Sequence, residues 1–198
     1  NNILLLHIAS DTVKSILNHD KDVFEHTLFV VDNIEPKLEI RLAALFHDIG
    51  KPNTFTIDEK GIGHFYGHHK ESERICRDVM SRLKYSNREI EHVSGLVYYH
   101  MIRYPHLRST SAKKFINKVG LEKLDDIFKL FVADRVSSKP PYDFEEIYKL
   151  KFECEKVLSE KQPLTIKDLD INGYDLMELG IPQGKEIGTT LNYLLEVV

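Results

Sequence analysis

The stretch LFHDIGKPNTF, residues 45–55, places the strongest constraint on how this chain can fold. Apolar residues at helical spacing lead into it and end on two adjacent ionisable residues, His47 and Asp48, which Gly50 and Pro52 follow closely. Burying isolated charges costs several kcal/mol each unless they are paired or bind a metal ion. The fold must therefore bring a partner to this point, and the candidates are a metal ion, a hydrogen-bonding group or water.

Apolar residues recur every three or four positions along most of the chain, which predicts an all-α protein. The predicted helices cover residues 10–18, 22–34, 37–49, 69–84, 86–100, 109–119, 121–138 and 142–160. The glycines and the DEKG sequence within residues 53–67 instead predict an irregular loop or a small hairpin. We expect a helical bundle over residues 1–161 and a separate C-terminal helical extension over residues 162–198.

Charge and cysteine content argue against several classes of protein. The formal net charge is -4, so nothing global indicates a nucleic-acid-binding protein, although a local basic patch is compatible with it. Cys76 and Cys154 lie far apart without metal-ligand spacing, and we expect reduced thiols in a cytoplasmic protein. No apolar run reaches the ~20 residues of a membrane span, and the apolar start lacks the basic region of a signal peptide. Since the first residue is Asn1 rather than Met, we expect a fragment, a processed product or a trimmed chain.

Four more ionisable residues stand where an apolar residue would continue a buried stripe. His26 lies within VFEHTLFVV, His68 follows the glycine-rich loop, His100 ends GLVYYH and Asp134 lies within LFVADRV. A divalent cation would remove the cost of burying several such groups together. Imidazole and carboxylate groups bind Zn²⁺, Mn²⁺, Fe or Ni²⁺, whereas Fe–S and Cu(I) sites use sulfur ligands. We therefore expect a divalent cation here; its identity among Ni, Mn, Mg, Zn and Fe, and whether one or two ions bind, stay open.

The order H…HD…D, formed by His26, His47–Asp48 and Asp134, resembles the HD superfamily of metal-dependent phosphohydrolases. Two longer stretches, RLAALFHDIGKP and TFTIDEKGIGHFYGHHKES, resemble the HD domain of bacterial tRNA nucleotidyltransferases, the CCA-adding enzymes. The C-terminal stretch DLDINGYDLMELGIPQGKEIGTTLNYLLEVV is similar to the corresponding segment of that family. The resemblance thus covers residues 19–198, which is nearly the whole chain.

The resemblance implies metal binding by the four residues of the pattern, with Asp48 able to bridge two ions or to accept the proton of an attacking water. In two-metal members, two further histidines complete a second site, and His68 and His100 lie in the matching interval. Each residue also has a plainer interpretation: a helix cap for His47–Asp48, a core histidine for His26, an ion pair for Asp134, and phosphate contact or packing for His68 and His100.

Three further residues are candidates for contact with substrate. Lys51 follows Asp48 by three residues, and the turn at Gly50 could direct its ammonium group toward the site, where it would hold phosphate and act with Asp48 in catalysis. The alternative is a solvated lysine at a helix C-terminus. His64 is expected to line the pocket, and Arg103 could bind phosphate. The other histidines are interpreted as ordinary surface or core residues, including His7, His19, His92 and His106.

The resemblance implies metal-assisted hydrolysis of phosphomonoesters and 2′,3′-cyclic phosphodiesters, with a phosphorylated nucleotide or a tRNA 3′-end as substrate and possible contact with tRNA. One departure from the family is large, because no Gly-Ser or Gly-Gly loop leads to paired carboxylates. Addition of nucleotides to tRNA therefore cannot be assigned to this chain. Two alternatives stay open: an HD hydrolase of another nucleotide such as (p)ppGpp, and a non-catalytic tRNA-binding structural domain. A cyclic-dinucleotide enzyme would carry a Gly-Tyr-Pro motif, which is absent.

Overall fold

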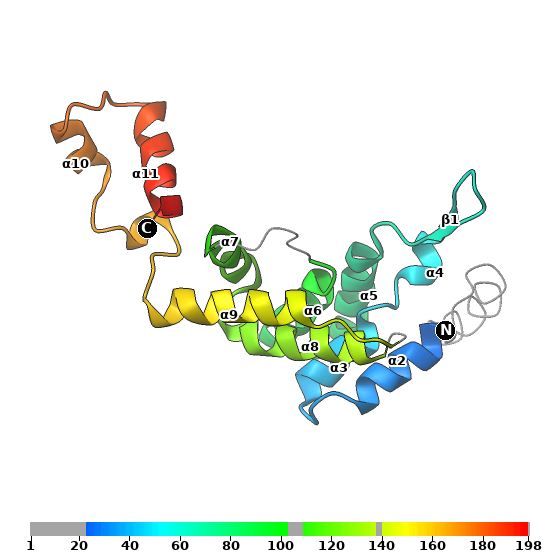
Figure 1. Ribbon diagram of the computed structural model, residues 1–198. Coiled ribbons are helices and arrows are strands. Elements are labelled where there is room, and N and C mark those ends of the chain that lie inside the picture. Colours follow the sequence, from blue (N-terminus) through cyan, green and yellow to red (C-terminus); the bar gives the residue numbers. More distant parts are fainter. Residues whose placement is uncertain (1–22, 103–108, 138–139, 198) are drawn as a thin grey trace. The chain divides into compact units, whose positions relative to one another are not determined.

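The structure is a computed structural model that describes residues 23–102, 109–137 and 140–197. Helices dominate these residues, and the one small sheet described is a two-stranded hairpin, which confirms the predicted all-α class (Figure 1). The helix predicted over residues 10–18 and the candidate Arg103 lie outside the described residues. Among the described helices, none is long and apolar enough to cross a membrane.

The Cα positions divide the described chain into two compact units, and the first contains the HDIGKP stretch. This unit takes in the described residues up to residue 102, together with Glu122–Ile147. Its longer helices are α2 (Val23–Asp32), α3 (Leu38–Phe46), α5 (His68–Arg82), α6 (Asn87–Tyr99) and α8 (Leu124–Val136). Its short elements are α4 (Lys51–Thr54), β1 (Thr56–Ile57), β2 (Gly63–His64) and most of η1 (Leu121–Lys123).

The core of this unit forms where α6 packs against α3 and α5, and where α3 packs against α2 and α8. The fully buried side chains follow helical spacing, which is the periodicity that the sequence predicted. They include Ile40 and Ala43 of α3, Val93 and Val97 of α6, and Ile127 and Leu130 of α8. Ser86 begins α6 with a capping box, in which its hydroxyl accepts from the backbone N–H of Glu89.

A tight turn after α3 joins the HD pair to α4 and to the hairpin. Gly50 lies so close to α5 that a Cβ atom there would stand 2.6 Å from Ser72 N and 2.7 Å from His68 O. The Gly50 N–H donates to Ser72 Oγ at 2.9 Å, which fixes this close approach. The predicted hairpin is present as β1 and β2, paired antiparallel with Thr56 opposite His64. The first two residues of the predicted 53–67 segment instead end α4.

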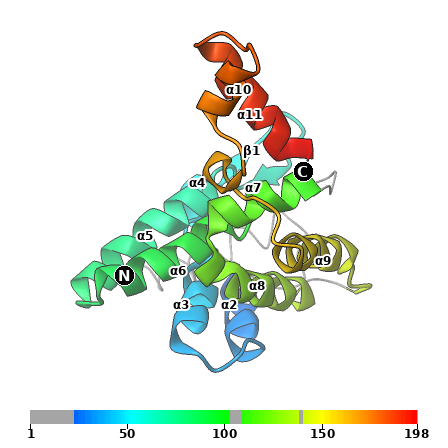
Figure 2. The ribbon, with the colours of Figure 1, turned by 90° about the vertical axis from the view of Figure 1, so that its left-hand side faces the viewer.

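The second unit contains the described residues from 109 to Leu121 and from Tyr148 onward. Its elements are α7 (Ser109–Val119), most of α9 (Glu145–Ser159), η2 (Ile166–Asp168), α10 (Gly173–Glu178) and α11 (Lys185–Val197). Within it α10 and α11 lie side by side (Figure 2). Asn117 Nδ2 donates to Leu164 O at 2.6 Å, and the buried Lys113 donates from Nζ to Leu195 O at 3.1 Å. The predicted extension from residue 162 lies inside this unit, and its independence from the preceding helix stays a prediction.

Candidate metal centre

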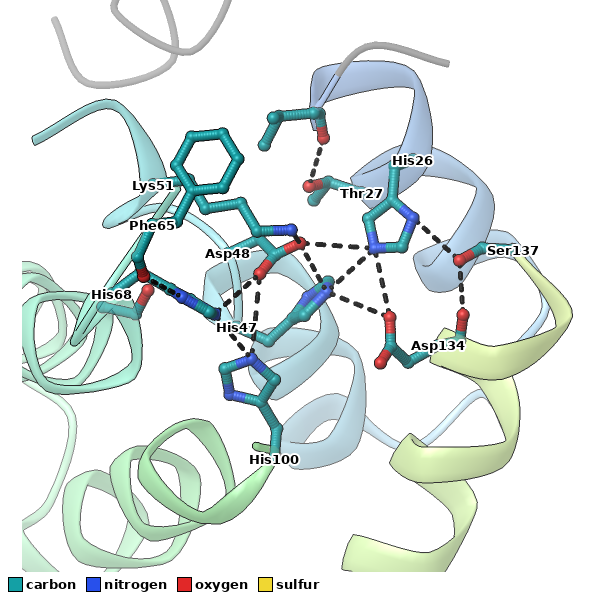
Figure 3. Close-up of polar contacts among 12 residues, drawn as sticks. His26, Thr27, His47, Asp48, Lys51, Phe65, His68, His100, Asp134 and Ser137 are labelled. Carbon is teal, nitrogen blue, oxygen red and sulfur yellow. Dashed lines mark hydrogen bonds and ion pairs between the residues drawn. The ribbon is translucent and has the colours of Figure 1, made fainter. Parts of the chain in front are cut away.

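Six ionisable side chains from five helical segments point toward one another in the first unit (Figure 3). Three of these segments present their C-terminal ends: His47–Asp48 follow α3 directly, His100 follows α6 directly, and Asp134 lies in the last turn of α8. The other two ligand candidates are His68, the first residue of α5, and His26 in α2. We call these six residues the metal centre: His26, His47, Asp48, His68, His100 and Asp134.

The metal centre consists of two groups of three residues. In each group the potential ligand atoms lie within 4.8 Å of one another. The first group is His26, His47 and Asp134, and the second is Asp48, His68 and His100. The structure therefore brings together all six residues that the sequence singled out as candidate ligands, and it divides them into two sets.

Asp48 lies between the two groups and faces each of them with a different oxygen. Its Oδ2 atom is 3.3 Å from His26 Nε2 and 3.2 Å from His47 Nε2. Its Oδ1 atom is 3.4 Å from His68 Nε2 and 3.7 Å from His100 Nε2. This is the position from which one carboxylate can serve two neighbouring cations.

Backbone carbonyl oxygens determine which nitrogen of three histidines carries the proton. The Nδ1 atoms of His47, His68 and His100 lie 2.7, 2.8 and 2.6 Å from the carbonyl oxygens of Ala44, Phe65 and Val97 respectively. A carbonyl oxygen only accepts hydrogen bonds, so each Nδ1 must donate. In the neutral ring, Nε2 then carries the lone pair and faces the metal centre.

Ser137 determines the tautomer of His26 by the same reasoning. The Ser137 hydroxyl donates its one proton to Asp134 O at 2.6 Å. Its oxygen, 2.8 Å from His26 Nδ1, can therefore only accept from that nitrogen. His26 Nε2 is left with the lone pair. No sequence pattern pointed to Ser137 in advance, and its spacing of three residues from Asp134 was the available signal.

The acceptor nitrogens of the metal centre face each other at hydrogen-bonding distance. His26 Nε2 lies 3.1 Å from His47 Nε2, and His68 Nε2 lies 3.3 Å from His100 Nε2. Two lone pairs cannot bond to each other, so each pair calls for an added proton or a metal ion. Imidazole nitrogens combined with carboxylates are a donor set that divalent transition metals prefer. The negative ends of three helix dipoles add a further preference for cations. The residues therefore fit a metal ion.

Electrostatics within the metal centre also favour bound positive charge. Burial alone would raise the pKa of both carboxyl groups, but their cationic and hydrogen-bonding neighbours outweigh it. Without a metal ion, a second proton on His26 would let its Nε2 donate to Asp134, and this hydrogen bond, together with the charge of His47, lowers the pKa of Asp134 to about 2. The pKa of Asp48 is held well below its ordinary value by His47 and Lys51. Burial lowers the pKa of His47 as well, yet the two carboxylates raise it above its ordinary value.

The three candidates for substrate contact are placed differently. Lys51 Nζ donates to Asp48 Oδ2 at 2.5 Å, and it lies 5.6 Å from the centre of the Phe65 ring. The turn at Gly50 thus does direct this ammonium group to the edge of the metal centre. His64 is not in either ligand group, and its Nε2 lies 2.9 Å from Asp58 Oδ2 in the hairpin. Arg103 lies outside the described residues.

Sequence comparison shows which known proteins this chain is similar to. The family model described as the HD domain matches residues 23–139, a range that includes every residue of the metal centre. The chain is 36% identical over 185 residues to a CC-adding tRNA nucleotidyltransferase of Thermus thermophilus, covering 90% of this chain and 41% of that protein. It is 30% identical over 188 residues to an A-adding tRNA nucleotidyltransferase of Deinococcus radiodurans, covering 90% of this chain and 43% of that protein. The chain thus spans about two fifths of the length of these curated relatives.

Proposed function

Because this chain belongs to the HD domain family, with a sequence of the type found in tRNA nucleotidyltransferases, we propose that it hydrolyses phosphate esters with the help of bound divalent metal. The position of Asp48 carries the proposal. Its two oxygens face two separate groups, each of which also presents two histidine nitrogens. A purely structural ion needs one closed set of ligands, whereas two adjacent sets are typical of sites that act on phosphate.

Two ions would share the metal centre. The first would be held by His26, His47 and Asp134, whose potential ligand atoms already lie close together. The second would be held by His68 and His100, and Asp48 would be common to both. Four imidazoles among six ligands favour Mn, Fe, Ni or Zn over Mg. When bound, such ions supply Lewis acidity and lower the pKa of a bound water toward ~7 from 15.7 in bulk water.

The chain's own residues would orient the phosphate and stabilise its charge. Asp48 is engaged through both oxygens, so its geometry favours a role as a bridging ligand over that of a proton acceptor. Lys51, with a side chain 23% exposed, stands where its ammonium group can reach a phosphate oxygen at the edge of the metal centre. Burial of His47, Asp48, His68 and His100 keeps bulk water away and strengthens these charge interactions.

The substrate that we propose is a phosphomonoester or a 2′,3′-cyclic phosphodiester, carried on a nucleotide or on a tRNA 3′-end. Both curated relatives are named for their action on tRNA, which supports contact of this chain with tRNA. We propose that this contact takes place in the cytoplasm. Addition of nucleotides, the activity in the relatives' names, is not part of the proposal, because the sequence lacks a loop that leads to paired carboxylates.

Elemental analysis combined with a substrate panel tests the proposal. The purified protein is analysed for bound metals and then assayed with phosphomonoesters and 2′,3′-cyclic phosphodiesters in the presence of Ni²⁺, Mn²⁺, Mg²⁺, Zn²⁺ or Fe²⁺. We expect up to two ions per chain and hydrolysis that depends on them. A His92→Ala variant serves as the control for general effects of removing a histidine, since His92 lies outside the two ligand groups. A metal-loaded protein that hydrolyses none of these esters would contradict the proposal.

A further inference from the structure

Two stacked aromatic rings lie immediately before His68 in the chain. The ring centres of His64 and Tyr66 are 4.9 Å apart, and the rings are nearly parallel, with an interplanar angle of 14°. Tyr66 is 75% exposed. Consecutive Cα atoms are 3.8 Å apart, so the Cα atom of Tyr66 lies within about 7.6 Å of that of His68. A large exposed aromatic residue therefore lies two positions along the chain from a ligand candidate of the metal centre.

The His64 ring of this stack is anchored by the turn of the hairpin. His64 Nε2 donates to Asp58 Oδ2 at 2.9 Å. The other oxygen of Asp58 accepts the backbone N–H groups of Lys60 and Ile62, each at 2.9 Å. The hydrogen bond from His64, followed by that from Ile62, lowers the pKa of Asp58 below its ordinary value. The His64 ring is thus held in one orientation by an ionised carboxylate, and it gives Tyr66 a fixed support.

Phe65 ties the stack to the metal centre, because it stands between the two stacked residues in sequence. Its ring packs against Phe55 with centres 5.4 Å apart, and Lys51 Nζ lies 5.6 Å from its centre. Its carbonyl oxygen accepts the Nδ1–H of His68 at 2.8 Å. The residue that orients a candidate metal ligand is therefore the same residue that separates His64 from Tyr66 in the chain.

Core packing does not explain why an aromatic residue stands at position 66, since three quarters of the surface of Tyr66 is exposed to solvent. A nucleobase stacks readily on such a surface, because every base has a flat aromatic face. We propose that Tyr66, supported by His64, is the stacking surface for the base of the substrate, so that the metal centre acts on phosphate esters that carry a nucleobase. This inference rests on the proposed function in one respect, which is that the metal centre hydrolyses the phosphate ester of the substrate.

A pair of substrates that differ only in the base gives the most direct test. Adenosine 5′-monophosphate and ribose 5-phosphate present the same phosphomonoester on the same sugar. Base stacking on an aromatic side chain corresponds to about 5- to 150-fold in affinity. We expect Tyr66→Ala to raise the KM for the nucleotide by this factor relative to the KM for the sugar phosphate. Any change in kcat should be the same for the two esters, because the stack does not touch the reacting phosphate.

Two further variants separate stacking from general damage. Tyr66→Phe keeps the ring and should preserve the preference for the nucleotide. Tyr174→Ala in α10 makes the same substitution at a residue that is 76% exposed in the other unit, and it should leave the ratio of the two KM values unchanged. Equal effects of Tyr66→Ala on both esters, or no effect on either, would overturn the inference.

Equilibrium binding distinguishes failure of this inference from failure of the proposed function. If neither ester is hydrolysed, the proposed function has failed, and calorimetry with the same two compounds still tests the stack. Weaker binding of the nucleotide alone to Tyr66→Ala supports the stacking surface, and equal binding of both compounds to the variant and the wild type refutes it.

The base can belong to a free nucleotide or to the end of an RNA, and a second pair of substrates separates these sources. Adenosine 2′,3′-cyclic phosphate is compared with a short RNA that ends in the same group. A rise in KM in Tyr66→Ala that is confined to the RNA assigns the surface to RNA ends, and a rise confined to the mononucleotide assigns it to free nucleotides. A rise for both substrates means that the surface reads the terminal base in either context.

Discussion

The two ends of α3, α6 and α8 hold charged residues in opposite ways. At the C-terminal ends, histidine nitrogens that can only accept face one another around Asp48. Toward the N-terminal ends, a second cluster, which we call the N-terminal network, consists of Lys37, His92 and Asp126. There Lys37 Nζ and His92 Nε2 both lie within hydrogen-bonding distance of Asp126 Oδ2, at 2.7 and 2.8 Å. The network balances its charge with protein groups, whereas the metal centre presents acceptors to acceptors.

The helix dipoles explain why these two arrangements occupy these two ends. Asp126 lies in the first turn of α8, where the positive end of the dipole stabilises a carboxylate. The metal centre lies at the negative ends of the dipoles of α3, α6 and α8, where a cation is stabilised. Burial of charge alone therefore does not identify a ligand site. The distinguishing feature is whether donors and acceptors match without an added ion.

Removing Asp48 should produce the largest effect, because both halves of the metal centre share it. We expect Asp48→Ala to abolish metal binding and hydrolysis together. Metal that binds only the folded state stabilises a protein by about 2.7 kcal/mol at 100 times its dissociation constant. Added metal should therefore raise the melting temperature of the wild type and leave that of the variant unchanged. Full metal content and an unchanged rate in Asp48→Ala would show that the metal centre does not depend on its central carboxylate.

Lys51 tests whether the metal centre performs catalysis or only stores metal. A protonated amine has no lone pair to give to a metal, so Lys51→Ala should keep its full metal content. Loss of one preorganised donor to a developing charge costs roughly 10²–10³ in turnover. We expect a loss of this size in kcat, measured on metal-loaded protein with a nearly normal melting temperature. Loss of metal would assign Lys51 a structural role, and an unchanged kcat would leave it a simple ion-pair partner of Asp48.

Ser137 gives a smaller and more selective effect, because it acts on the metal centre through His26. Its hydroxyl accepts from His26 Nδ1 and so keeps the lone pair on Nε2. Loss of such a supporting hydrogen bond typically costs 10–100-fold in metal affinity. We expect Ser137→Ala to weaken metal binding by this factor in a titration, and Ser137→Thr, which retains the hydroxyl, to recover most of it. Equal affinities in Ser137→Ala and the wild type would mean that His26 is oriented by its packing alone.

The sequence predicted most of the first unit because its signals are local. Helical spacing located α3, α5 and α6, and the glycines located the hairpin. The ligand candidates could be recognised because each breaks an apolar stripe, and the structure brings all six together. Their binding of metal stays a prediction. The resemblance to the HD family of tRNA nucleotidyltransferases is confirmed by the comparisons.

What the sequence did not predict depends on contacts between distant residues. Lys37 and Asp126 are 89 positions apart, and His92 and Asp126 are 34 apart, so no periodicity relates them. His92 was interpreted only as an ordinary histidine for this reason. Ser137 escaped notice because a serine after a helix is common, and its role follows only once α2 packs against α8. Packing between helices decides such pairings, and local spacing carries no information about it.

Breaking the N-terminal network should produce the smallest effect and one that leaves metal binding intact. Asp126→Asn removes the charge that Lys37 and His92 share. Lys37 is 43% exposed in its side chain and stays hydrated, so we expect a loss of only about 1 kcal/mol in the free energy of unfolding. Urea unfolding measures this loss, and elemental analysis should find the same metal content as in the wild type. Asp78→Asn, at an exposed carboxylate 3.7 Å from Arg82, is the matched control and should have almost no effect.

The pH dependence of this difference shows whether the charge of Asp126 is what stabilises the fold. Burial would raise the pKa of Asp126, but the hydrogen bonds from Lys37 and His92 outweigh it and lower the pKa below 3.8, its ordinary value. A carboxyl group with a lowered folded-state pKa contributes stability above its unfolded pKa and loses it as the pH falls through the folded value. The stability difference between wild type and Asp126→Asn should therefore be constant at neutral pH and shrink below pH 3.8. If the stability difference is the same at about pH 3 as at about pH 7, shape and hydrogen bonding, rather than charge, hold the network together.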